Sequence, residues 1–221
     1  MQAYLVSVVI PVLNEAASLQ QTVASIGDHA DTEILVVDGG STDGTIELAR
    51  SSGCTVLHAP RGRGTQLATG ARAARGRWLW FVHADTRVPA SWRQILLDAQ
   101  HPAACLRLQL EGTHPGLRLI ELGAWVRTAW DSIPYGDQTL WIARSLYLSA
   151  GGYDAVPLFE DVLLARRLRD MGSPVARLPA AACSCARRWH HDGLWQRTVR
   201  NWHLRWLFER GTDPRDLATR Y

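Results

Sequence analysis

The sequence predicts an α/β protein in which helices flank a mostly parallel central sheet. Two observations lead to this fold class. Short runs rich in Val and Ile alternate with segments whose apolar residues recur at helical spacing. Two of these runs end in a lone carboxylate, Asp38 and Asp85. Alternating strands and helices form parallel sheets with right-handed crossovers, and ligands bind at the carboxyl ends of the strands.

The individual elements follow from the same patterns. Apolar runs predict strands at residues 5–10, 33–37, 55–57, 78–82 and 104–110, the first of them stopped by Pro11. Gly76 and Gly172 each follow a helical pattern, and Pro89 opens one. Helices are predicted at residues 15–26, 42–52, 65–75, 90–99, 117–129 and 161–171. The alternation loosens after about residue 100, but no linker or repeat interrupts the chain, so we expect one domain over residues 1–221.

Composition excludes several classes of protein. The 221 residues are 47% hydrophobic, which suffices for a packed core, and the net charge of +3 is too small to indicate nucleic-acid binding. Arginines cluster at residues 61–77 and 187–210, which suits a phosphate-bearing ligand. No signal peptide and no apolar run of about 20 residues is visible. We expect a soluble protein, attached at most to a membrane surface.

The four cysteines do not form a zinc pattern. Cys183 and Cys185 are too close together for the usual zinc or thioredoxin spacing, and Cys54 and Cys105 stand alone. Reduced, buried cysteines are typical of cytosolic proteins. We therefore expect a cytoplasmic protein.

Four motifs occur in the order of a known family. They are VVIPVLNE at residues 8–15, VVDGGSTDGT at 36–45, HAD at 83–85 and FED at 159–161. Together they resemble the landmarks of family 2 glycosyltransferases. The tail and the PYGDQ segment at 134–138 resemble a small bacterial branch associated with radical-SAM and selenodomain proteins. The resemblance implies the GT-A fold, a Rossmann-like nucleotide-diphospho-sugar transferase, with a nucleotide-binding half at residues 1–100 and an acceptor half with C-terminal helices at 101–221.

The resemblance also implies a donor site for a nucleoside-diphosphate sugar. It assigns Asp38 to the base or ribose, although an Asp at this position also begins ordinary Asx-turns. Arg61 to Gln66 form a basic loop suited to a diphosphate, with a solvated loop as the alternative for Arg61. The predicted donor-binding residues are Pro11, Asn14, Glu15, Asp38, Arg63, Gln66, His83 and Asp85.

Asp85 resembles the last acid of the family's Asp-x-Asp metal motif. Mg²⁺ and Mn²⁺ prefer oxygen ligands, so the resemblance implies a divalent cation at Asp85. The chain departs from the pattern at His83, which stands where the first Asp is usual. A neutral imidazole could accept a hydrogen bond from a ribose hydroxyl or bind Mn²⁺. The alternative is that His83 and Asp85 only hold the turn before Pro89.

The resemblance makes Asp161 the general base of an inverting transfer, with Glu160 beside it shaping acceptor contacts. Two acids at the start of a helix are also common for purely structural reasons. Candidate residues for the diphosphate or acceptor are Asp137, Gln138, Arg187 and Arg188. Arg187 and Arg188 alternatively form a basic strand edge. The acceptor is not identifiable from the sequence.

An apolar stripe marks the last third of the chain, where Trp195, Val199, Trp202 and Trp206 recur at helical spacing. Such stripes usually pack in a core, and we predict that this one does. The alternative is a helix that lies on the inner face of a membrane as a peripheral contact.

Two other functions fit parts of the sequence. A sugar nucleotidyltransferase would show a Gly-x-Gly-Thr-Arg loop after the first strand, where this chain has PVLNE at residues 11–15. A non-catalytic sugar-nucleotide binder or membrane adaptor would not need both Asp85 and Asp161. Release of nucleoside diphosphate from a donor panel distinguishes these from a glycosyltransferase.

Overall fold

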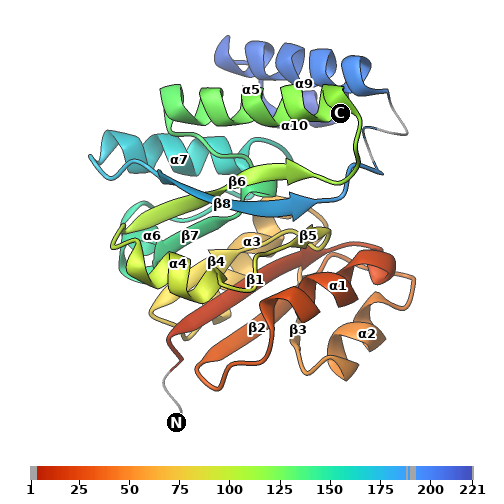
Figure 1. Ribbon diagram of the computed structural model, residues 1–221, viewed down its shortest axis with the longest axis vertical. Helices are drawn as coiled ribbons and strands as arrows, with labels where there is room; N and C mark the ends of the chain where they lie inside the picture. Colours follow the sequence, from red (N-terminus) through yellow and green to blue (C-terminus); the bar gives the residue numbers. More distant parts are fainter. Residues whose placement is uncertain (1–3, 188, 190–192, 221) are drawn as a thin grey trace.

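The structure, a computed structural model, describes residues 4–187, 189 and 193–220. Arg188 therefore lies outside the described residues. Within the described part, eight strands form one sheet in the order β3-β2-β1-β4-β7-β6-β8-β5 (Figure 1). Their bounds are β1 (Val6–Val12), β2 (Thr32–Asp38), β3 (Thr55–His58), β4 (Trp78–Phe81), β5 (Thr86–Arg87), β6 (Ala103–Leu110), β7 (Leu140–Ala143) and β8 (Ala176–Ser184).

The first four predicted strands are confirmed as a parallel unit. β1 pairs in parallel with β2 and β4, and β2 pairs in parallel with β3. Beyond β4 the sheet is mixed, because β7 is antiparallel to both β4 and β6, while β6 and β8 are parallel and β5 is antiparallel to β8. The predicted parallel order thus holds for the half that carries Asp38.

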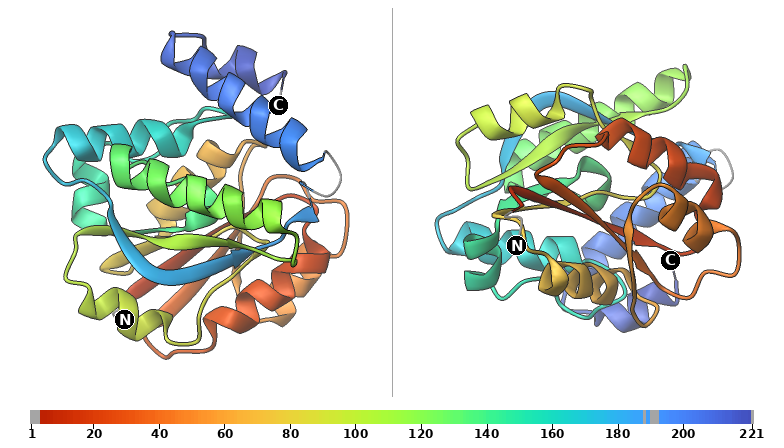
Figure 2. Two further views of the ribbon diagram at one scale, coloured as in Figure 1. Left: turned by 45° about the horizontal axis from the view of Figure 1, so that its top comes forward. Right: turned by 90° about the horizontal axis from the view of Figure 1, so that it is seen from below.

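Helices cover both faces of the sheet (Figures 1 and 2). Side chains alternate along β1, so Val8 and Ile10 join a core cluster with Leu19 of α1 and Trp92 of α4, while Val9 joins another with residues of α3 and α7. The helices are α1 (Ala16–Ile26), α2 (Thr45–Ser51), α3 (Arg63–Ala73), α4 (Trp92–Asp98), α5 (Pro115–Asp131), α6 (Arg144–Ser149), α7 (Glu160–Asp170), α9 (Leu194–Glu209) and α10 (Pro214–Ala218).

The six predicted helices are all present with small shifts at their ends. The end of β1 differs more, because the strand continues through Pro11 instead of stopping there. Pro11 pairs with Val37 of β2, whereas β4 ends at Phe81, opposite Val9. Proline costs a strand little where no neighbour needs its missing N–H.

Apart from the two-residue β5, the strands that we did not predict are β7 and β8, which lie after residue 132. β8 contains Pro179 and four alanines, and β7 has only four residues, so neither carries a β-branched alternating pattern. Pairing with β6 and β4, which distant parts of the chain supply, makes them strands.

The prediction that the Trp stripe packs in the core is wrong. Trp195, Val199, Trp202 and Trp206 are 62%, 64%, 72% and 47% exposed. The opposite face of α9 is buried instead, through Arg197, Leu204 and Phe208. Phe208 stacks on Phe159 with ring centroids 4.7 Å apart, and Leu204 and Leu207 pack against the same core cluster. Periodicity identified an amphipathic helix but not the face that turns inward.

The cysteines are free thiols, as predicted, but only two of the four are buried. Cys54 and Cys105 are buried, whereas Cys183 and Cys185 are half-buried. Burial raises the pKa of Cys54 to about 11. None of the helices in the described residues combines the length and the apolarity needed to cross a membrane.

Candidate active site

A cleft of about 530 Å³ opens at the carboxyl ends of β1 and β4. This is the edge at which open α/β sheets bind ligands. We call it the strand-end cleft; its walls come from the loops after β1, β3 and β4, the loop before α7, and α10. It is lined by Pro11, Val12, Leu13, Glu15, Arg61, Gly62, Arg63, Gln66, His83, Ala84, Asp85, Pro157, Leu158 and Ala218.

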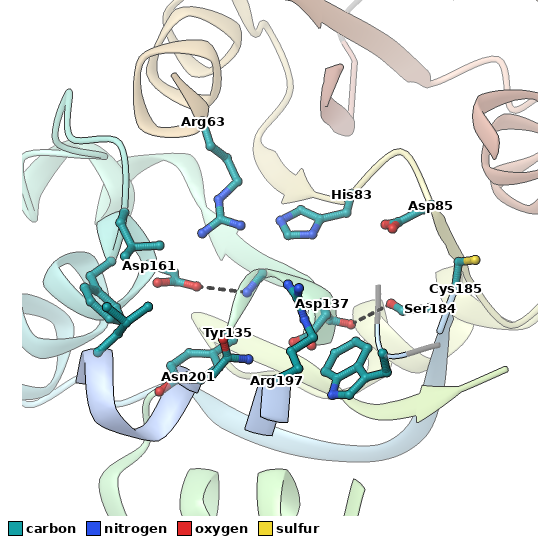
Figure 3. Close-up of a pocket in the computed structure, with 15 residues that line it drawn as sticks. Arg63, His83, Asp85, Tyr135, Asp137, Asp161, Ser184, Cys185, Arg197 and Asn201 are labelled. Carbon is teal, nitrogen blue, oxygen red and sulfur yellow. Dashed lines mark hydrogen bonds between the residues drawn. The ribbon is translucent and has the colours of Figure 1, made fainter. Parts of the chain in front are cut away.

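A second cavity, of about 120 Å³, adjoins the cleft, and we call it the inner pocket. The two share Arg63, His83, Asp85 and Leu158. In Figure 3, Asp161 and Asp137 face the space between Arg63 and His83 on one side and Tyr135 and Arg197 on the other. The pocket is lined by Arg63, His83, Asp85, Tyr135, Gly136, Asp137, Leu158, Phe159, Asp161, Ser184, Cys185, Trp189, Arg197, Asn201 and Leu204.

Asp38 is buried at the end of β2 and does not line either cavity. Its carboxylate accepts hydrogen bonds from the backbone N–H groups of Gly40 and Ser41 at 3.0 Å, the Asx-turn that was the structural alternative. Burial alone would raise the pKa of Asp38, but these bonds and nearby His58 hold it below its usual value. Asp38 therefore orders the turn beside the cleft.

Asn14 also holds this turn. Its Oδ1 accepts a hydrogen bond from Thr42 N at 2.8 Å, and its backbone N–H donates to Ser41 Oγ at 2.9 Å. Asn14 has φ +56°, a left-handed conformation that asparagine adopts more readily than most residues. It joins the loop after β1 to the loop after β2 and is absent from the linings of both cavities.

Gln66 lines the strand-end cleft, but both N–H groups of its side-chain amide already donate hydrogen bonds within the protein. Nε2 donates to the carbonyl oxygens of Val12 and Val37, both at 2.8 Å. These carbonyls end β1 and β2, so Gln66 fixes α3 to the carboxyl edge of the sheet. Its role in the structure is to shape the cleft floor.

Hydrogen bonds connect the turn that carries His83 and Asp85 to β5 and to the end of β8. Thr86 N donates to the His83 carbonyl at 3.1 Å, and Cys185 N donates to the Asp85 carbonyl at 3.0 Å. The hydroxyls of Thr86 and Ser184 are 2.8 Å apart and hydrogen-bonded. β5 and β8 therefore hold this turn at the junction of the two cavities.

Half-buried Arg63 and buried Glu160 form an ion pair across the site. Arg63 Nε donates to Glu160 Oε1, and only 1% of the Glu160 side chain is exposed. Burial raises the pKa of Glu160, as does nearby Asp161, while Arg63 opposes the shift. The pair fixes the start of α3 to the start of α7, which leaves Glu160 outside the lining of the inner pocket.

Asp161 projects into the inner pocket from the first turn of α7. Its Oδ2 accepts a hydrogen bond from Gly136 N at 2.9 Å, and Oδ1 accepts from Val162 N at 2.8 Å. The residue before the helix, Phe159, has φ +64°, which is costly for an aromatic residue and characteristic of functional sites. This backbone turn aims Asp161 at the pocket while Glu160 turns inward.

Asp137 and Gln138, although adjacent, point to different places. Asp137 lines the inner pocket, and burial raises its pKa to about 6, with Arg127 opposing and Asp161 and Asp85 reinforcing the shift. Gln138 is fully buried, and its Oε1 accepts hydrogen bonds from Thr128 and Arg127. Gln138 thus stabilises the turn and does not line the pocket.

Arg187 pairs with Glu15 in the first loop, at the border of the strand-end cleft. Its guanidinium lies 3.3 Å from Glu15 Oε2, which joins the segment after β8 to the segment after β1. Glu15 lines the strand-end cleft, so the pair lies at its border. Tyr135, Trp189, Arg197 and Asn201 are among the pocket residues that were not predicted as site residues. Arg197 and Asn201 lie on α9 away from the Trp stripe, so a correct choice of its inner face would have found them.

The residues at the junction suit a partly protein-bound divalent cation. Among the described residues, no group of three His, Cys, Asp or Glu side chains could enclose a metal. Mg²⁺ and Mn²⁺ in nucleotide sites instead often take one or two carboxylates and complete their shell with phosphate and water oxygens. Asp85 lines both cavities and lies close enough to raise the pKa of Asp137. The metal ligands available here therefore fit a divalent cation that Asp85 would hold together with a bound phosphate.

Sequence comparison matches residues 7–105 to the model of glycosyl transferase family 2. A PGL/p-HBAD biosynthesis glycosyltransferase of Mycobacterium bovis is 36% identical over 94 residues, covering 38% of this chain and 37% of the relative. Glycosyltransferase AglJ of Haloferax volcanii is 40% identical over 52 residues, 24% of this chain and 17% of the relative. The chain thus matches only about a third or less of the length of these relatives.

Solved structures share the fold. Glucosyl-3-phosphoglycerate synthase of Mycobacterium tuberculosis, in complex with Mn²⁺, UDP and glucosyl-3-phosphoglycerate, superposes with a TM-score of 0.58 at 21% identity, covering 82% of this chain and 72% of the other. The mannosyltransferase PcManGT of Pyrobaculum calidifontis, in complex with GDP-Man and Mn²⁺, gives 0.60 at 22% identity, covering 81% and 56%. The chain has the GT-A fold, and its residues 7–105 match the model of glycosyl transferase family 2.

Proposed function

We propose that this protein is an inverting glycosyltransferase that moves a sugar from a nucleoside-diphosphate sugar to an acceptor hydroxyl. The strand-end cleft takes the donor and the inner pocket takes the acceptor. The observation that carries the proposal is the position of Asp161, which lines the inner pocket beside the residues common to both cavities. The similar structures with UDP or GDP-Man support the donor class.

Asp161 acts as the general base. As the acceptor oxygen attacks the anomeric carbon, its proton passes to Asp161, and the bond from that carbon to the diphosphate oxygen breaks with its electron pair leaving on the diphosphate. One displacement inverts the anomeric centre. Two backbone N–H groups hold the carboxylate, so it is oriented before the acceptor binds.

The other residues bind and orient the substrates. Arg63 lines both cavities and places positive charge near the diphosphate. Asn201 Oδ1 is buried with no hydrogen-bond partner among the described residues, so it is available to accept a hydrogen bond from an acceptor hydroxyl. A divalent cation held by Asp85 would, when bound, offset negative charge on the leaving diphosphate by several kcal/mol.

The test is release of nucleoside diphosphate from a panel of UDP- and GDP-sugars in the presence of Mn²⁺. Slow donor hydrolysis substitutes for transfer until an acceptor is known. We expect release from at least one donor, with loss of release in Asp85→Asn. A protein that binds a donor tightly and releases nothing under any condition would instead be a non-catalytic binder.

A further inference from the structure

Two neighbouring helices each carry a line of exposed apolar side chains. On α5, Leu119, Leu122, Val126 and Trp130 are 58%, 57%, 58% and 92% exposed. On α9 the exposed residues are Trp195, Val199, Trp202 and Trp206. We call these eight residues the α5–α9 face. The two helices lie side by side at one end of the molecule (Figures 1 and 2). Apolar surface of this extent on a folded protein marks an interaction site.

A groove of about 580 Å³ runs along this face and borders the inner pocket. It is lined by Arg127, Tyr135, Val199, Asn201, Trp202, His203, Arg205, Trp206 and Glu209. Tyr135 and Asn201 line both the groove and the inner pocket. Whatever covers the α5–α9 face therefore lies within about one helix diameter, roughly 10 Å, of the candidate active site.

The charge around the face is positive. Of the four arginines in residues 194–210, Arg197 is buried on the opposite side of α9, Arg200 and Arg205 are half-buried and Arg210 is exposed, and the one acid is Glu209. Arg205 and Arg166 both pair with Glu209, which neutralises that acid. Arg210 is exposed, and its guanidinium lies 3.8 Å from the centre of the Trp206 ring. Exposed Trp side chains beside an exposed Arg are typical of helices that lie in the headgroup region of a bilayer.

We propose that the α5–α9 face docks this protein on an anionic lipid bilayer, with α5 and α9 lying flat on the surface. The Trp and Leu side chains enter the headgroup boundary, and the exposed Arg118 of α5 and Arg210 of α9 contact the anionic headgroups. A second copy fits the charges less well. A symmetric interface would bring the same arginine-rich edge of both copies together.

The experiment is co-sedimentation of the full chain with vesicles. One set contains phosphatidylcholine and phosphatidylglycerol, and the other contains phosphatidylcholine alone. The test variant is Trp130→Ser/Trp202→Ser, which removes two exposed rings. The matched control is Leu148→Ser/Met171→Ser, which changes two side chains with 57% and 47% exposure outside the face. Melting curves and size-exclusion chromatography accompany every variant.

We expect the wild type to sediment with the anionic vesicles more than with the neutral ones, and less at high salt. The Trp variant should melt like the wild type and bind about tenfold more weakly or worse, while the control binds normally. No binding by the wild type, or equal binding by the Trp variant, would overturn the proposal. So would a concentration-dependent dimer that the Trp variant abolishes. None of these readouts needs turnover, so their failure would leave the proposed transfer reaction untouched.

Discussion

Arg63 donates through Nε to the buried carboxylate of Glu160, although the two residues are 97 positions apart in the chain. This pair joins the first turn of α3 to the first turn of α7. Glu160 Oε2 has no hydrogen-bond partner among the described residues, so the carboxylate depends heavily on Arg63. The neighbouring Asp161 is thereby left to face the pocket. Glu160 therefore stabilises the fold, and Asp161 is the acid that we propose as the general base.

Removal of Arg63 should therefore destabilise the protein strongly. Arg63→Ala leaves a buried carboxylate uncompensated, and we expect a loss of about 3–5 kcal/mol in the free energy of unfolding. Arg63→Met/Glu160→Met should recover most of that loss, because it removes both charges. Urea unfolding of the wild type, Arg63→Met, Glu160→Met and the double variant measures the coupling between the two residues. Additive losses in the double variant would show that the pair is not coupled.

Much of this site was predictable because it follows strand ends. Asp85 and His83 come directly after a buried apolar run, and parallel strands put such residues at one edge. The roles of Asp38 and Gln138 were harder to foresee, since the sequence does not show which hydrogen bonds a polar side chain has already made. Arg197 was hidden for another reason: an amphipathic helix shows two faces, and the burial of either depends on its tertiary neighbours.

Asp161→Asn tests the general base. Asparagine keeps the shape but cannot take a proton, so turnover should fall about 10²–10⁴-fold while donor affinity changes little. The amide has only one acceptor oxygen for Gly136 N and Val162 N, so a stability loss of about 1 kcal/mol should accompany it. Asp170→Asn, in the last turn of the same helix, is the control. Near wild-type turnover in Asp161→Asn with none in Glu160→Gln would move the base to Glu160.

The cation assignment predicts linked losses of metal and donor. A chelator should weaken binding of the nucleoside diphosphate, and Mn²⁺ should restore it. Asp85→Asn should bind the diphosphate as weakly as chelated wild type, and added Mn²⁺ should not help. Isothermal titration with UDP and GDP measures both. Equal affinity of wild type with and without chelator would remove the metal from the proposal.

Asp137 predicts a pH dependence of stability. Its pKa of about 6 in the folded protein exceeds the ordinary 3.8, so the folded state binds this proton more tightly than the unfolded chain. The free energy of unfolding should fall as pH rises from about 4 to 6, by up to about 3 kcal/mol from this group. Asp137→Asn should lose that slope relative to wild type and be more stable at pH 7. Exposed Asp98→Asn is the control, and an identical slope in Asp137→Asn would contradict the prediction.

Gly136 lies between the candidate base and His83, and its lack of a side chain keeps them in place. A Cβ added there would lie 2.2 Å from His83 Nε2. Gly136→Ala should therefore displace the imidazole, cost about 1–3 kcal/mol in stability and reduce donor turnover. Gly123→Ala on α5 is the matched control. It has nothing within 4 Å and should stabilise the helix by about 0.5–1 kcal/mol.

A second variant separates the clash from other effects of the new methyl group. If His83 is the group displaced, Gly136→Ala should cost little stability when it is introduced into His83→Ala, because that background has removed the imidazole. Activity should not return, since His83 lines both cavities. Thermal unfolding of the four proteins in this cycle measures the coupling. Equal losses from Gly136→Ala in the two backgrounds would mean that the strain lies in the backbone that donates to Asp161 and not in the contact with His83.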